Sequence, residues 1–256
     1  MKIQKEGPVV LNSRRQGQVA ILTIDRSNRR NALGSELMRA LETAFLELEE
    51  DSGAAAIIIS GTSPGFCAGS DLKELAAMTI PQMCRHEAET ARIVRMIGFM
   101  EKPVVAAVSG FALGGGVGLA AGCDLIVTHA ECRWHMPEVP NGWLPPWALE
   151  SISQRVGPVT ARRLVWASEP ITGAEAHALK LADYLVPQDK VEYEAIALGE
   201  RLAALPRVAV ASTKRFFAAL VNGRAEASDM LANRIFAENC QDEASKETLR
   251  KFGMRV

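Results

Sequence analysis

Apolar and polar positions along the first part of the chain predict strands that alternate with helices. Residues 19–24 (VAILTI) are mostly β-branched, follow Gly17 and precede a polar run at 25–28, which predicts a strand entering a loop. A helix is predicted from Ser35, with Glu36 in its first turn, because apolar residues then recur on one face. That face consists of Leu37, Met38, Leu41, Phe45 and Leu48. Residues 55–59 form a continuous apolar run, which is typical of a strand buried on both faces.

The same order of elements returns further along the chain. Residues 104–108 are predicted as a strand, 114–116 as a glycine turn, 117–121 as a short helix and 125–127 as another strand. This alternation indicates an α/β architecture. From about Thr172 onward the pattern is mostly helical, with few strand signals and many alanines.

One segment has the length of a membrane span. Residues 104–123 contain no charged side chain, but six glycines interrupt them, and each weakens a helix interior by about 1 kcal/mol relative to alanine. A strand, a turn and a short packed helix explain the segment better. Residues 1–6 lack the apolar region of a signal peptide. We therefore expect a soluble, cytoplasmic protein.

Composition excludes several classes of function. The net charge of the 256 residues is -1, which offers no basic surface for nucleic acid. The 48% of hydrophobic residues can form a large core. The five cysteines form no C-x-x-C pair, and the four histidines show no ligand spacing, so neither a disulfide framework nor a metal site is expected.

Two turns rich in small residues could bind an oxyanion. Residues 114–118 (GGGVG) follow a predicted strand and open a helix, and residues 66–73 (FCAGSDLK) form a second such turn before a helix. Close packing of strand and helix explains consecutive glycines equally well. If both turns point a backbone N–H at one oxygen, they supply the two donors that an oxyanion hole requires.

Glu138 is the candidate acid or base. It lies between Pro137 and Pro140, and three of the four tryptophans flank it (Trp134, Trp143 and Trp147). A loop glutamate is usually solvated at the surface. Apolar neighbours could instead desolvate the carboxylate, raise its pKa and suit it to proton transfer.

Taken together, these residues resemble the enoyl-CoA hydratase/isomerase family, also called the crotonase family. The resemblance spans nearly the whole chain, and an ordered set of motifs carries it. These are RNAL at 30–33, FCAGSDLK at 66–73, KPVVAAVSG at 102–110, ALGGG at 112–116, CD at 123–124, PE at 137–138 and ITGAEA at 171–176, followed by closing helices from Arg215 to Phe252.

The resemblance implies an α/β fold of the ClpP/crotonase type, a spiral of repeated β-β-α units. It implies a core over residues 1–195 and a helical C-terminal region over 196–256 that builds a homotrimer or a dimer of trimers. The partner would be an acyl-CoA, with coenzyme A as part of the substrate and no separate cofactor. No nucleic acid or membrane partner is expected.

The resemblance also implies roles for single residues. Ser70 and Gly115 would donate their backbone N–H groups to the thioester oxygen, and Glu138 would be the general base and acid. The substrate-binding residues would be Arg30, Ala68, Asp71, Leu72, Gly114 and Trp143.

One departure from the family pattern narrows the chemistry. Hydratases of this family carry two glutamates, and the first should lie at position 118, where this chain has Gly118. A single carboxylate, Glu138, can move a proton between two carbons, which favours double-bond isomerisation. Hydration, or a hydratase-lyase or decarboxylase reaction on an aromatic or branched acyl-CoA, is the alternative, as is a CoA-thioester binding protein without catalysis. The bulky loop at 142–147 (GWLPPW) would shorten the acyl pocket or line it for a ring.

Overall fold

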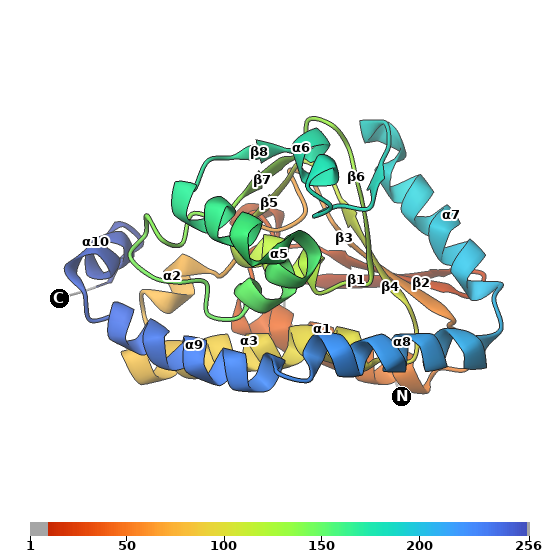
Figure 1. Ribbon diagram of the computed structural model, residues 1–256, viewed down its shortest axis with the longest axis horizontal. Coiled ribbons are helices and arrows are strands. Elements are labelled where there is room, and N and C mark those ends of the chain that lie inside the picture. Colours follow the sequence, from red (N-terminus) through yellow and green to blue (C-terminus); the bar gives the residue numbers. More distant parts are fainter. Residues whose placement is uncertain (1–9, 255–256) are drawn as a thin grey trace.

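A six-stranded sheet runs through the centre of the molecule in the computed structural model (Figure 1). In spatial order its strands are β1 (Leu11–Gln16), β2 (Val19–Ile24), β3 (Ala56–Gly61), β4 (Val104–Val108), β6 (Leu125–Thr128) and β9 (Tyr184–Leu185). β1 pairs with β2 antiparallel, and every later neighbour pair is parallel. The structure describes residues 10–254, apart from the side chains of 220–222. The segment judged for a signal peptide, residues 1–6, therefore lies outside the described residues, as do the two ends of the expected domains.

A second, smaller sheet lies beside the first. It contains β5 (Phe111–Leu113), β7 (Arg133–His135) and β8 (Ile171–Thr172). The chain gives one strand to each sheet and then forms a helix, first as β4, β5 and α4 (Gly115–Ala121), then as β6, β7 and α5 (Ala148–Ala167). The repeated β-β-α unit is therefore present.

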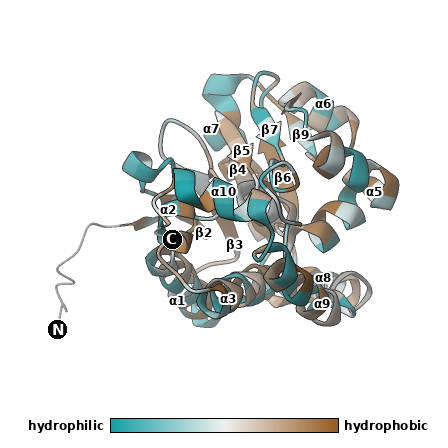
Figure 2. Cartoon of the chain, turned by 90° about the vertical axis from the view of Figure 1, so that its left-hand side faces the viewer, coloured by the Kyte–Doolittle hydropathy of each residue, from teal (hydrophilic) through white to brown (hydrophobic). Residues whose placement is uncertain are grey.

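The remaining helices cover the sheets and form the C-terminal part. They are α1 (Ser35–Glu50), α2 (Leu72–Leu75), α3 (Ile80–Phe99), α6 (Gly173–Ala178), α7 (Val191–Ala203), α8 (Arg207–Asn222), α9 (Ala225–Asn239) and α10 (Glu243–Lys251), with short 3₁₀ turns η1 (Ser27–Arg29) and η2 (Gln188–Lys190). Figure 2 shows α1, α3, α8 and α9 gathered on one side of the sheet. No helix within residues 10–254 is long and apolar enough to cross a membrane.

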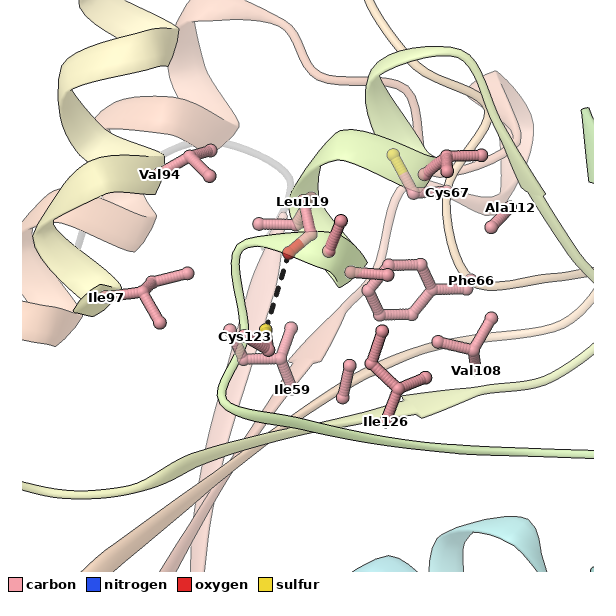
Figure 3. Packing of buried hydrophobic residues seen from close by; sticks show 14 of the residues in the cluster. Ile59, Phe66, Cys67, Val94, Ile97, Val108, Ala112, Leu119, Cys123 and Ile126 are labelled. Atoms are coloured by element: carbon pink, nitrogen blue, oxygen red, sulfur yellow. Dashed lines mark hydrogen bonds between the residues drawn. The ribbon is translucent and has the colours of Figure 1, made fainter. Parts of the chain in front are cut away.

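Both faces of the central strands are buried. In β3, Ile57 and Ile59 face the main core, which α3 and α4 cover, while Ile58 faces α7. Figure 3 shows this main core around Phe66 and Leu119. The continuous apolar run at 55–59 is explained by this two-sided burial, as the sequence predicts.

The structure confirms the predicted strands and helices of the first half, with small shifts at their ends. The run at 55–59 becomes β3, which starts at Ala56, and the helix expected at 117–121 starts two residues earlier as α4. The expected domain boundary at 195/196 falls inside α7, and residues of α7 on both sides of it pack against β2, β3 and β4. The division into two regions stays a prediction.

Candidate active site

Two turns of the chain meet at the edge between the two sheets. The backbone of Cys67 forms a bridge to Ala112, and its carbonyl accepts a hydrogen bond from Leu113 N (2.9 Å). Gly69 has a positive φ of 85°, and a Cβ there would lie 2.9 Å from Gly115 N. Only glycine permits this approach at this backbone conformation. The two turns that the sequence singles out are therefore in direct contact.

In the described part of the chain, each of these turns carries a backbone N–H without a protein acceptor. Leu33 pairs with the residues on either side of Ser70, through Gly69 O and Asp71 N, and leaves Ser70 N free. Gly115 is the first residue of α4, where no intrahelical acceptor exists for the N–H. Among the hydrogen bonds of residues 10–254, neither N–H donates to another protein group. This arrangement suits an oxygen that develops negative charge.

Glu138 lies in a tight turn after β7, beside these donors. Asn141 N donates to Pro137 O and Trp143 N to Glu138 O, both at 3.1 Å, and these bonds close the turn. The residue is 9% exposed, and its Oε2 has no hydrogen-bond partner in the described part of the chain. Burial raises the pKa of Glu138 to about 8. A carboxyl group with such a pKa can both take and return a proton near neutral pH.

Gly114 lets the Glu138 carboxylate approach the second turn. Its φ is 52°, and a Cβ there would lie 2.7 Å from Glu138 Oε1. The missing side chain therefore places the carboxylate next to the backbone that leads into Gly115.

These groups line a small cavity of about 60 Å³. Of the residues singled out in the sequence, the lining includes Ala68, Ser70, Leu72, Gly114, Gly115, Glu138 and Trp143. Seven of the nine predicted site residues therefore meet at one cavity.

Arg30 and Asp71 lie beside this cavity and outside its lining. The exposed Arg30 places its guanidinium 4.8 Å from the centre of the Phe111 ring, and its carbonyl accepts from Ala68 N. Asp71 caps α2 by accepting from Lys73 N and Glu74 N and also pairs with Arg26 (3.1 Å). Asp71 thus holds the first turn in place, and a direct role of either residue in substrate binding stays a prediction.

One residue of the site, Glu87, was missed in the sequence. Glu87 of α3 lines the same cavity, is 2% exposed and accepts hydrogen bonds from Ser70 Oγ (3.0 Å) and Trp147 Nε1 (2.8 Å). Trp147, which belongs to the loop at 142–147 that the sequence analysis expects at the acyl pocket, is 5% exposed and forms one wall. The signal for Glu87 was its position among Met83, Ala91 and Val94 on the buried face of α3.

The Trp147 ring occupies the space beside Gly118. A Cβ at Gly118 would lie 2.5 Å from Trp147 Cζ3 and 2.7 Å from Ala148 Cβ. The resemblance places the first glutamate of hydratases at position 118. In this chain the Trp147 indole occupies the space beside Gly118, and its N–H donates to Glu87.

The contact between Gly118 and the Trp147 ring determines whether Gly118→Ala raises or lowers the free energy of unfolding. Glycine to alanine inside an open helix stabilises by about 0.5–1 kcal/mol, but we expect Gly118→Ala to destabilise by about 1–3 kcal/mol because the methyl group overpacks the indole. Denaturant unfolding measures the change. In a Trp147→Leu background the same substitution should cost less, and an equal cost in both backgrounds would show that the indole is not the obstacle.

Within residues 10–254, no group of three or more His, Cys, Asp or Glu side chains is arranged to hold a metal ion. The cavity is lined by two buried carboxyls, Glu87 and Glu138, and by the turns that carry the two N–H groups.

Comparison with known proteins settles the family. The sequence profile of the enoyl-CoA hydratase/isomerase family matches residues 14–255, nearly the whole chain. The chain belongs to the enoyl-CoA hydratase/isomerase family. It is thus an enzyme of this family, whose members act on acyl-CoA substrates.

Named relatives agree with this membership. A Thermus thermophilus protein named as an enoyl-CoA hydratase is 32% identical over 240 residues, covering 93% of this chain and 95% of that protein. A short-chain-enoyl-CoA hydratase of Clostridium acetobutylicum is 28% identical, covering 93% and 92%. A crystal structure of an enoyl-CoA hydratase/isomerase from Mycobacterium paratuberculosis superposes with a TM-score of 0.87 at 26% identity, covering 96% and 100%. The crotonase fold expected from the resemblance is confirmed.

Proposed function

We propose that this chain is an enoyl-CoA isomerase that moves a double bond within a short acyl group held as a CoA thioester. One observation carries the proposal. Glu138 is a buried carboxyl with a raised pKa, and within residues 10–254 one of its oxygens has no partner and two N–H donors beside it are free. The place of a first hydratase glutamate is taken by the Trp147 ring.

The chemistry follows from these groups. With a 3-enoyl-CoA, the Glu138 carboxylate removes a proton from the carbon next to the thioester. The electrons move onto the thioester oxygen, which the N–H groups of Ser70 and Gly115 would stabilise. Glu138 then returns the proton to the fourth carbon, and the double bond ends next to the thioester. No atom is gained or lost.

The size of the cavity supports a short acyl chain. Its volume is about 60 Å³, and Trp143, Trp147 and Phe236 wall it in. Trp143 and Phe236 are packed edge to face at 6.2 Å. Coenzyme A would be part of the substrate, outside this cavity on the side of Arg30, and we propose no separate cofactor.

Hydration is the second candidate. A second buried carboxyl, Glu87, lines the same cavity, and the relatives above carry the name hydratase. Two carboxyls could position and deprotonate a water as the family's paired glutamates do.

We also propose a cytoplasmic homotrimer or dimer of trimers. Large apolar side chains on α8 and α9 support self-association, because they are exposed in the single chain. They are Val208, Phe216, Phe217, Met230 and Leu231, each at least 55% exposed.

Mass spectrometry separates the candidate reactions. The enzyme is incubated in deuterated water with a 2-enoyl-CoA and, separately, with a 3-enoyl-CoA. We expect the double bond to move, deuterium to enter the acyl chain and no water to be added. Addition of water to the 2-enoyl-CoA would replace isomerase by hydratase. If neither thioester changes, the isomerase proposal is wrong, and lyase or decarboxylase chemistry or a non-catalytic binding role takes its place.

A further inference from the structure

Glu87 is a buried carboxyl group with a hydrogen-bond donor for each of its two oxygens. It lies in the middle of α3 on the face turned to the core, and both of its oxygens accept hydrogen bonds. An unpaired carboxylate in such a place is costly. Here the donors are a hydroxyl and an indole N–H, which offset part of the cost of the charge, and no salt bridge to Glu87 forms among the described residues.

The two donors are also two walls of the catalytic cavity. Ser70 provides the side chain that binds Glu87 and the backbone N–H that faces the expected thioester oxygen. Trp147 provides the ring that fills the space at Gly118. Glu87 therefore fixes the orientation of both elements, and it lines the same cavity as Glu138.

Hydrogen bonding distinguishes the two carboxyls. Glu87 accepts two hydrogen bonds, which favour its ionised form, while Glu138 Oε2 has no partner in the described chain. Glu138 therefore holds a proton more readily than Glu87 does. Carboxyls that interact in this way titrate as a pair.

We propose that Glu87 is a positioning residue for the proton transfer: ionised, it holds Ser70 and Trp147 in place and sets a negative charge against Glu138. The inference rests on the proposed function, because it takes Glu138 as the proton carrier. Before transfer both carboxyls are charged and repel each other. When Glu138 takes the proton this repulsion disappears, which makes Glu138 a stronger base than a lone carboxylate would be.

Few other titratable groups act on the pair. Burial raises the pKa of Glu87, and the charge of His86, the indole and the hydroxyl oppose this rise. For Glu138, burial is the main cause of its pKa of about 8, a backbone hydrogen bond opposes it, and the charge of Glu87 adds to it. The thiols Cys84 and Cys240 also face Glu87, but burial raises the pKa of both, so they stay neutral at the pH of the test.

The test is the pH dependence of kcat/KM, which reports on the free enzyme. Since Glu138 must lose its proton to act as base, wild-type kcat/KM should rise with pH through about 8. Glu87→Gln keeps the shape and one acceptor but removes the charge, which lowers the pKa of Glu138. We expect the rise to move to lower pH by about one unit and the plateau of kcat to fall several-fold.

Control variants separate charge from structure. Glu89→Gln, on the exposed side of the same helix, should leave rate and profile unchanged. Trp147→Phe and Ser70→Ala each remove one hydrogen bond but leave the Glu87 carboxyl in place, so they should lower the rate and shift the pH at which kcat/KM rises less than Glu87→Gln does. If Glu87→Gln lowers the rate but kcat/KM still rises at the same pH as in the wild type, Glu87 is a structural residue only and the inference is overturned.

A second measurement does not depend on the reaction. The Glu138 carboxyl of protein carrying ¹³C-labelled glutamate is titrated by NMR and assigned by its absence in Glu138→Gln. A lower pKa in Glu87→Gln supports the inference even if no isomerisation occurs, in which case only the proposed function fails. An unchanged pKa in an active isomerase overturns the inference alone. If Glu87→Gln does not fold, the double variant Glu87→Leu/Trp147→Phe is used, because it removes the indole donor and its acceptor together. The pKa of Glu138 in this variant is then compared with its pKa in Trp147→Phe alone.

Discussion

Replacing Glu138 by glutamine should lower kcat by about 10²–10⁴-fold, the usual contribution of a positioned general base or acid. The amide has the size of the carboxyl but cannot carry a proton between carbons. The backbone of the turn does not depend on the side chain, because the turn is closed by N–H groups of Asn141 and Trp143 bonded to main-chain carbonyls. The donors at Ser70 and Gly115 are backbone groups too, so substrate binding should persist.

Two measurements check this expectation. Turnover is followed by the double-bond shift, and binding by calorimetry with a saturated acyl-CoA that cannot react. Glu89→Gln is the matched control, since it makes the same chemical change on an exposed part of α3. Full turnover in Glu138→Gln would exclude Glu138 as the proton carrier, whereas loss of binding together with turnover would point to a structural role.

Replacing Trp147 by alanine should change which acyl chains the enzyme accepts. The ring is 5% exposed and lines both the 60 Å³ cavity that holds Glu138 and a larger hollow of about 760 Å³, which α3, α4, α5, α8 and α9 surround. Removing the ring joins the two spaces. We expect the preference for 3-butenoyl-CoA over 3-decenoyl-CoA to fall by about tenfold or more, because discrimination by an apolar wall depends on excluded methylenes.

The same variant should be less stable by about 3–5 kcal/mol, since a buried tryptophan is removed. Trp166→Ala is the control, because that ring is 67% exposed on α5 and its loss should affect neither property. Denaturant unfolding and the ratio of kcat/KM for the two thioesters are measured in parallel. An unchanged ratio in a folded variant would show that Trp147 does not limit the acyl chain.

Much of the fold was predictable because its signals are local. The run at 55–59 is apolar at every position, and only burial on both faces explains that. The apolar face of α1 repeats at helical spacing for the whole helix. Both patterns show which faces of an element are buried, but they do not identify the elements that pack against those faces.

The candidate site was predictable only in part. Ser70, Gly115 and Glu138 lie in motifs, so the resemblance located them and the structure brought them together. Glu87 lies in a helix with no motif, and its role depends on two donors that are 17 and 60 residues away in the chain. In the sequence, Gly118 marked the loss of a glutamate. That a tryptophan ring takes up the vacated space is a fact of packing between α4 and the start of α5, which spacing alone does not reveal.

The position of α9 bears on when the protein can become active during its synthesis. Phe236 of α9 lines the cavity of the candidate site, and Asn239 Oδ1 accepts from Leu144 N of the loop that follows Glu138. Arg95 of α3 pairs with Asp229 of α9, which ties the helix that carries Glu87 to the same segment. Every other part of the site precedes α9 in the chain. A nascent chain can therefore assemble the sheets and the N–H donors first, and it acquires an enclosed site only after α9 has left the ribosome.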